Sequence, residues 1–280
     1  MNKTNLIIFI LVIFLGALGL AIYYQTKPVQ EQTIQDIQPI LPPEPVKKPI
    51  VHYPVPEPVE EPEPLLSEKT DSTEQKVTPQ LPKVLPQVQD SDQSIQAALN
   101  SLFSIKITGK LLYLENFIQR FVATIDNLPE KRLPRAHLPL KAPGGKFLVA
   151  GTSDAPQTSS RNNKRYNAYL VLLESINDDR AIQIYTHFYP LFQKAYEQLG
   201  YQNAYFNDRL VFVIEHLLET PNPPDPIQLS QPAVLFTYAD PNLEKLSSGQ
   251  KVLLRIGQDQ RMRTVNVLDR YRKKLTSLHP

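Results

Sequence analysis

Two side chains in this sequence have the spacing of a serine nucleophile and its lysine base. Ser248 and Lys251 form a Ser-x-x-Lys pair, in which a lysine one helical turn away can activate a serine. No Lys-Thr-Gly sequence follows Lys251, and a Ser-Ser-Gly sequence at a helix start is ordinary capping chemistry. We therefore expect this pair to be structural.

A metal site is the second candidate. Glu215, His216 and Glu219 lie on one predicted helix, and His187 lies on another. The first helix lacks the His-x-x-x-His spacing that places two imidazoles on one face. A lone histidine beside a wide apolar face is more often a hydrogen-bonded residue at the edge of the core. We expect no catalytic residues, no metal ligands and no cofactor, so the sequence favours a noncatalytic protein over an enzyme.

The candidates for a partner-binding surface lie before and within the most apolar predicted helix. Tyrosine offers a flat apolar face with a polar tip, and arginine can bind carboxylates or phosphates through two hydrogen bonds. A structural alternative is that Asp208 and Arg209 form an ion pair or a helix cap. The residues predicted to form the surface are Tyr201, Tyr205, Asn207, Asp208 and Arg209.

The last predicted helix is basic, which leaves a nucleic-acid-binding alternative open. Its cations are Arg261, Arg263, Arg270, Arg272, Lys273 and Lys274. With Gly257 as the turn, the last two helices superficially resemble a helix-turn-helix reader. Nucleic-acid binding would require a cytoplasmic domain.

An N-terminal membrane anchor is predicted over residues 1–27. Residues 6–22 are seventeen consecutive residues without a charged or strongly polar side chain, and Tyr23 and Tyr24 follow where an interfacial aromatic belt would lie. The alternative is a cleavable signal peptide, but its apolar region would be only about 7 to 15 residues long. Lys3 and the free amino terminus precede the run, so a weak positive-inside bias places the C-terminal bulk outside the cytoplasm. We expect a single-pass protein of the bacterial inner membrane with a periplasmic domain.

Residues 28–90 are predicted to be a disordered, proline-rich spacer. They contain 14 prolines in 63 residues, no glycine, and 11 acidic against 5 basic residues. Such a stretch excludes regular helix and sheet and favours polyproline II, which would span about 190 Å if fully extended. A stiff tether is the simpler interpretation, and a ligand for SH3-like or WW-like modules is the alternative.

Residues 91–280 are predicted to form a mainly α-helical domain, a compact bundle with a short β-hairpin or strand pair. Apolar residues recur at three-and-four spacing, and glycine, proline and capping residues mark the ends. Helices are expected over residues 91–104, 111–127, 166–176, 182–199, 205–219 and 247–256, from Asp240 and Pro241 onward, and over 258–278. A hairpin is expected near residues 146–150, a strand near 234–238, and a kink at Pro190. The chain has no cysteine, which excludes disulfides, thiol nucleophiles and zinc-cysteine sites.

Six sequence blocks of the predicted domain resemble a known family. They are residues 123–129 (ATIDNLP), 188–193 (FYPLFQ), 199–201 (LGY), 205–210 (YFNDRL), 238–241 (YADP) and 249–257 (GQKVLLRIG). Over residues 95–275 the chain resembles the bacterial domain-of-unknown-function family 3014. The resemblance implies an envelope protein of Gram-negative type and carries over no catalytic residues. The partners expected are the membrane, through the anchor, and an envelope protein or peptidoglycan, with an enzyme acting on the cell wall or envelope as the alternative.

Overall fold

The computed structural model describes residues 52–56, 81–103 and 105–278. The predicted anchor and most of the predicted spacer lie outside these residues. Within the part of the chain that the structure describes, no helix is both long and apolar enough to cross a bilayer.

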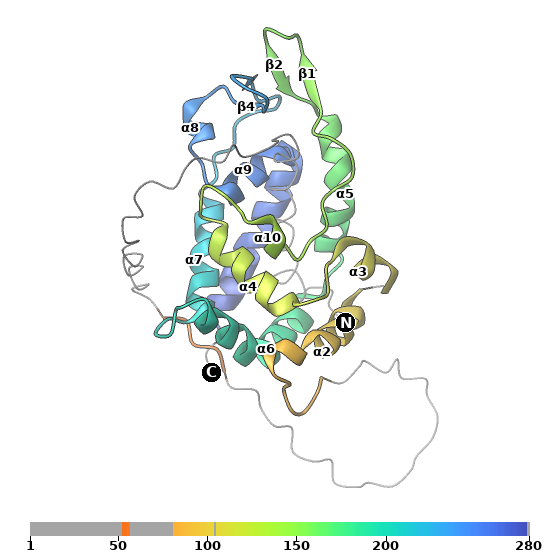
Figure 1. The fold of residues 1–280 in the computed structure, drawn as a ribbon, viewed down its shortest axis with the longest axis vertical. Helices are drawn as coiled ribbons and strands as arrows, with labels where there is room; N and C mark the ends of the chain where they lie inside the picture. Colours follow the sequence, from red (N-terminus) through yellow and green to blue (C-terminus); the bar gives the residue numbers. More distant parts are fainter. Residues whose placement is uncertain (1–51, 57–80, 104, 279–280) are drawn as a thin grey trace, which may run out of the picture.

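The architecture is mainly α-helical, as predicted, with two small antiparallel strand pairs (Figure 1). Short 3-10 turns lie at η2 (Val88–Asp90) and η3 (Arg135–His137). The helices are α2 (Asp92–Leu102), α3 (Ile105–Leu111), α4 (Phe117–Asn127), α5 (Arg161–Glu174), α6 (Asp178–Gln198), α7 (Phe206–Leu218), α8 (Pro241–Glu244), α9 (Ser248–Arg255) and α10 (Gln258–Thr276). The strands are β1 (Val149–Gly151), β2 (Pro156–Thr158), β3 (Leu229–Ser230) and β4 (Thr237–Tyr238), and β1 pairs with β2 and β3 with β4.

The centre of the bundle is formed by α4, α6, α7 and α10. Helix α10 packs along α7, and α4 packs against both α6 and α7. An aromatic cluster joins three of these helices: the ring centroid of Phe192 lies 5.2 Å from that of Phe121 and 5.8 Å from that of Phe206. All three rings are fully buried. Because Phe206 is the first residue of α7, this cluster fixes the start of that helix within the core.

The strand pairs lie at the end of the molecule away from α2 and α6 (Figure 1). A second apolar cluster holds them to α9, with Ile227, Leu229, Tyr238 and Leu254 among its buried members. The hairpin expected near residues 146–150 is present as β1 and β2. The predicted strand over residues 234–238 is wrong for its first part, because only Thr237 and Tyr238 pair.

The prediction of one helix over residues 111–127 is also wrong. The chain leaves the helix after Leu111, and α4 begins six residues later, with Asn116 in the left-handed region at φ 50°. Tyr113 N donates to Pro139 O at 2.7 Å, so this stretch pairs with a distant segment. Asp92 accepts hydrogen bonds from the amides of Asn116 and Phe117 at 2.7 and 3.0 Å. The Asp92 carboxylate, at the start of α2, therefore caps α4.

Helix-end signals that depend on local sequence are confirmed. Asp240 accepts from the amide of Asn242 at 2.8 Å as the cap of α8, with Pro241 as the first helical residue. Helix α6 closes before Gly200, whose φ is +107°. These ends form as expected because the capping atoms lie within a few residues of the amides they bind.

Part of the predicted spacer packs on the domain. Tyr53, Val55, Leu81 and Leu85 are partly buried against the main core, and Val88 is 3% exposed. Residues 52–56 and 81–90 therefore belong to the packed part of the chain, although their proline content predicts a tether. The apolar side chains between the prolines provide the contact.

Candidate functional site

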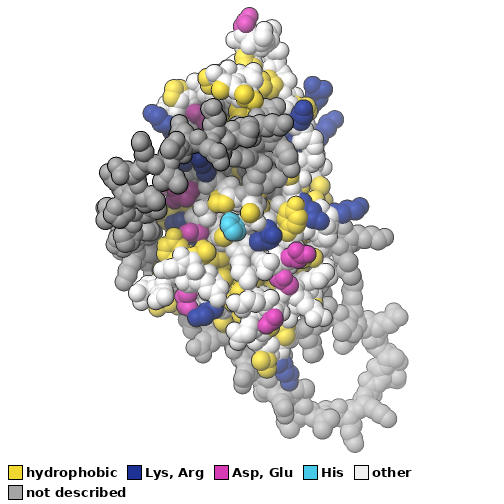
Figure 2. Space-filling model, in the orientation of Figure 1, with side chains coloured by type: hydrophobic (Ala, Val, Ile, Leu, Met, Phe, Trp, Pro, Cys, Tyr) yellow, Lys and Arg dark blue, Asp and Glu magenta, His cyan; other side chains and the backbone are white. Residues whose placement is uncertain are grey.

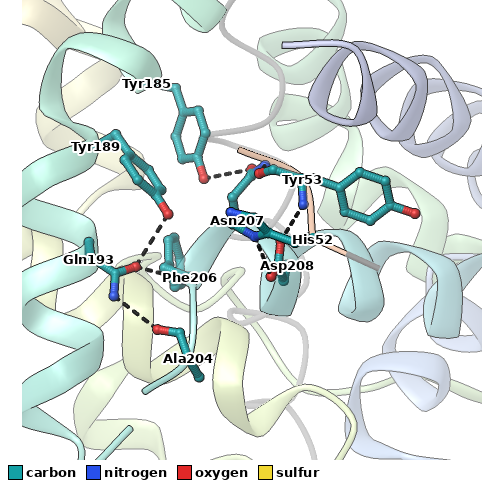
Figure 3. A network of polar contacts seen from close by, with 9 residues as sticks. All are labelled: His52, Tyr53, Tyr185, Tyr189, Gln193, Ala204, Phe206, Asn207 and Asp208. Atoms are coloured by element: carbon teal, nitrogen blue, oxygen red, sulfur yellow. Dashed lines mark hydrogen bonds and ion pairs between the residues drawn. The ribbon is translucent and has the colours of Figure 1, made fainter. Parts of the chain in front are cut away.

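A non-helical stretch of the predicted spacer lies against the start of α7 (Figures 1 and 3). We call residues 52–56 the docked segment, and Tyr205, Asn207 and Asp208 the docking site. Asp208 Oδ1 accepts a hydrogen bond from the Tyr53 amide at 2.7 Å, and Asp208 Oδ2 lies 2.9 Å from His52 Nδ1. Asn207 Nδ2 donates to the Tyr53 carbonyl at 2.8 Å. Two side chains of α7 thus bind both main-chain polar groups of one residue in the segment.

Ring and apolar contacts add to these bonds. The imidazole of His52 lies over the ring of Tyr205, with centroids 3.9 Å apart and planes 32° apart. Tyr205 is 51% exposed, whereas the Asp208 side chain is 3% exposed. The site therefore has a half-exposed aromatic ring beside a buried carboxylate, an arrangement suited to a flat or cationic side chain such as that of His52.

A buried tyrosine of α6 orients the side chain of Asn207. The Tyr185 hydroxyl donates to Asn207 Oδ1 at 3.0 Å, and both side chains are buried. Burial raises the pKa of Tyr185 well above its usual value, so this hydroxyl stays protonated and acts as a donor. Because the amide oxygen is engaged, the NH2 group of Asn207 is directed at the docked segment.

The turn before α7 is held by Gln193 of α6 (Figure 3). Its Oε1 accepts from the Phe206 amide at 2.8 Å and from the Tyr189 hydroxyl at 3.2 Å, while its Nε2 donates to the Ala204 carbonyl at 2.9 Å. An amide of the first helical turn, which has no partner within the helix, is thereby satisfied. These bonds hold the turn that leads into the docking site.

The other two residues of the predicted surface belong to a separate cluster. Arg209 Nε lies 3.0 Å from Asp126 Oδ1, Arg209 Nη2 donates to the Asp126 carbonyl at 2.7 Å, and the Tyr201 hydroxyl donates to Asp126 Oδ2 at 3.1 Å. These bonds tie the end of α4 to α7. Asp208 and Arg209 do not pair with each other but face different partners, a spacer residue and a core helix.

The Ser-x-x-Lys pair has structural partners. Ser248 Oγ is 3.3 Å from the carbonyl oxygens of Asn127 and Leu128, and Lys251 forms an ion pair with Glu244. The serine that caps α9 is Ser247, within a capping box completed by Gln250. Each member of the pair is bonded to a different neighbouring element.

The histidines weighed as ligands lie in separate settings. His216 Nε2 is 2.9 Å from Ser247 Oγ, and His187 bonds to the backbone of Pro82. Burial lowers the pKa of both histidines, which favours the neutral ring at pH 7. Within the described residues no three His, Cys, Asp or Glu side chains converge as a metal site would require. A cavity of about 270 Å³ beside Ser160, Asn163 and Arg255 contains none of the predicted site residues.

The cations of α10 are paired or buried. Arg263 pairs with Glu174, Arg270 with Asp178, Lys274 with Asp179, and Arg272 and Lys273 with Asp269. Arg261 is 1% exposed and donates to Asn222 and to the Pro223 carbonyl. Basic and acidic side chains are both visible on the face in Figure 2. The helix is therefore not the uncompensated basic surface that phosphate recognition uses.

Sequence reasoning missed His52 and Tyr53. The signal was present: they are the only histidine and the only aromatic residue between positions 28 and 90, and they are adjacent. An isolated His-Tyr pair ahead of Pro54 and Pro56 is typical of a short recognition segment rather than of a uniform tether.

Taken together, the fold and the site define a mainly helical domain that holds a short proline-containing segment at a helix start. Residues 117–272, more than half of the chain, match the family described as "Protein of unknown function (DUF3014)", and the chain belongs to this family. Comparisons with curated proteins and with solved structures gave no match.

Proposed function

We propose that this chain is a membrane-anchored envelope protein whose helical domain is a noncatalytic interaction module. In this proposal the apolar run 6–22 is the anchor, and the proline-rich spacer positions the domain in the periplasm. The observation that carries the proposal is the docking site, because its groups bind a main-chain amide, a main-chain carbonyl and a ring. These are the contacts of recognition rather than of bond cleavage.

The site favours a protein partner over a sugar polymer. Asp208 accepts from the main-chain amide and Asn207 donates to the main-chain carbonyl of one residue, which is how an extended peptide strand is bound. The ring of Tyr205, on which His52 lies, supplies the side-chain contact. The proposed partner is therefore an envelope protein that presents an extended segment.

The first test is topology. A fusion of alkaline phosphatase after Pro280 should be active in intact cells, and a fluorescent protein that folds only in the cytoplasm should be dark at the same position. The reverse pattern would place the domain in the cytoplasm. It would overturn the proposal and favour the nucleic-acid-binding alternative that involves α10.

The second test is site-directed crosslinking in the same cells. A photoreactive residue at Tyr205 should give a crosslinked adduct with an envelope protein, and Asp208→Asn should abolish it. The matched control is the same photoreactive residue at Phe212, which is 45% exposed on the same helix but outside the docking site. Equal adducts at the two positions would contradict a specific interaction surface.

A further inference from the structure

We propose that the docking site is a peptide-recognition site whose resident ligand is the chain's own docked segment, and that a partner binds by inserting a segment of the same chemistry in its place. This inference rests on the proposed function and names the partner class for the same site. The class is an imidazole or cationic residue, then a large apolar residue other than proline, then proline.

The first position is defined by a ring and a carboxylate. His52 is stacked on Tyr205 and lies 2.9 Å from Asp208 Oδ2. The carboxylate is buried and stands in the first turn of α7, where the helix dipole stabilises a negative charge. Imidazole or guanidinium satisfies both groups, whereas an acidic side chain would meet a buried like charge.

The second position is defined by its backbone. The Tyr53 amide donates to Asp208 and its carbonyl accepts from Asn207, so proline is excluded here for lack of an N–H group. The Tyr53 side chain packs against the core, which favours a large apolar residue. The next residue, Pro54, disfavours the helical conformation at Tyr53 and holds it extended before binding. Less conformational entropy is then lost on docking.

The docked segment is small enough to be displaced. Among the residues that the structure describes, Asn207 and Asp208 make its polar contacts, and His52 on Tyr205 and the partly buried Tyr53 and Val55 make its ring and apolar contacts. Covalent linkage gives it an effective concentration on the order of 1 mM. A free peptide of the same sequence must compete with the tethered segment. Its apparent dissociation constant rises by a factor of 1 plus the effective concentration of the segment divided by the dissociation constant of the segment. For a dissociation constant of about 0.1 mM the factor is about ten.

The experiment titrates a fluorescein-labelled peptide of residues 50–58 into the full-length protein in detergent micelles and reads fluorescence anisotropy. The wild type is compared with His52→Ser/Tyr53→Ser, which removes the ring contact on Tyr205 and the apolar contact of Tyr53, weakens the resident ligand and leaves the docking site intact. We expect the double variant to bind the peptide about tenfold more tightly than the wild type. Adding Asp208→Asn to the double variant should abolish binding, whereas Glu215→Gln, a change of another acidic residue on α7, should not.

Two altered peptides test the recognition rules. A peptide with proline in place of Tyr53 should not bind, because the donor to Asp208 is absent, and a peptide with glutamate in place of His52 should not bind either. If Asp208→Asn impairs folding by circular dichroism, Tyr205→Ser at an exposed position should weaken binding instead.

Equal binding by the wild type and the double variant, or binding by the double variant that Asp208→Asn and Tyr205→Ser leave unchanged, would overturn the inference. Sedimentation of the wild type as a dimer that dissociates in His52→Ser/Tyr53→Ser would also overturn it, because the segment would then belong to a second copy. A cytoplasmic topology result combined with tenfold tighter peptide binding would refute the proposed function but not the recognition site.

Discussion

Gly257 links α9 to α10, and its replacement by alanine tests how strongly this position requires glycine. Its backbone has φ 90° and ψ 159°, a region adopted essentially by glycine alone. An added Cβ would overlap Asn163 Oδ1 and lie 2.6 Å from Asn163 Nδ2. Gly257→Ala therefore combines backbone strain with overpacking.

The two costs can be separated with other glycines. Backbone strain in this region costs about 1–3 kcal/mol, and turning the half-buried Asn163 side chain aside adds about 0.5–1.5 kcal/mol, so we expect Gly257→Ala to lower the free energy of unfolding by about 1.5–4.5 kcal/mol. Gly200 has φ +107° but nothing within 4 Å of an added Cβ, so Gly200→Ala should show the strain alone. Gly109 in α3 has neither feature, and Gly109→Ala should stabilise by about 0.5–1 kcal/mol.

The assay is urea denaturation of the full-length protein, followed by circular dichroism at a helical wavelength. Asn163→Ala removes the overlapping atoms, so in a double-mutant cycle it should restore about 0.5–1.5 kcal/mol to Gly257→Ala. Equal stabilities of Gly257→Ala and Gly200→Ala, with no coupling to Asn163, would refute the packing argument.

Three further predictions concern the site and its supports. Asp208→Asn removes a charged acceptor worth about 1.5–3 kcal/mol, so the Tyr53 amide should exchange with solvent about 10 to 150 times faster by NMR; unchanged exchange would contradict docking through this carboxylate. Burial lowers the pKa of His216, so the unfolded chain binds more protons than the folded one below pH about 6.5, and stability should fall on acidification from pH 7 to 5. His216→Asn should flatten that slope, and an unaltered slope would assign it to other groups. Arg261→Lys loses the planar donor set that binds Asn222 and should cost about 1–3 kcal/mol in urea denaturation, whereas a cost near zero would show that this buried contact is dispensable.

The start of α7 illustrates how far local sequence leads. The apolar spacing of residues 205–219 predicts the helix, and the sequence places the surface candidates Tyr205, Asn207 and Asp208 at its start. Their hydrogen-bond partners were not predictable. Tyr185 and Gln193 reach α7 from another helix, and His52 reaches it from more than 150 positions earlier in the chain.

For the C-terminal helix, the sequence alone suggests a surface that the structure does not contain. Its six cations read as a basic surface along the sequence, yet the acids that compensate them include Glu174, Asp178 and Asp179, about 90 residues away. Net charge and its position along a chain are sequence properties. Whether a cation is free for a phosphate depends on which acids the fold brings within reach.

The sequence by itself determined the helical class, most helix boundaries and the caps of α8 and α9. These follow from periodicity, proline content and capping, which operate within a few residues. Only the tertiary structure decided that the helix expected from Leu111 breaks, that Asp92 caps α4, and that residues 52–56 dock on Asn207 and Asp208. Contacts between distant segments outweigh local preference where they bury apolar side chains and satisfy main-chain hydrogen bonds together.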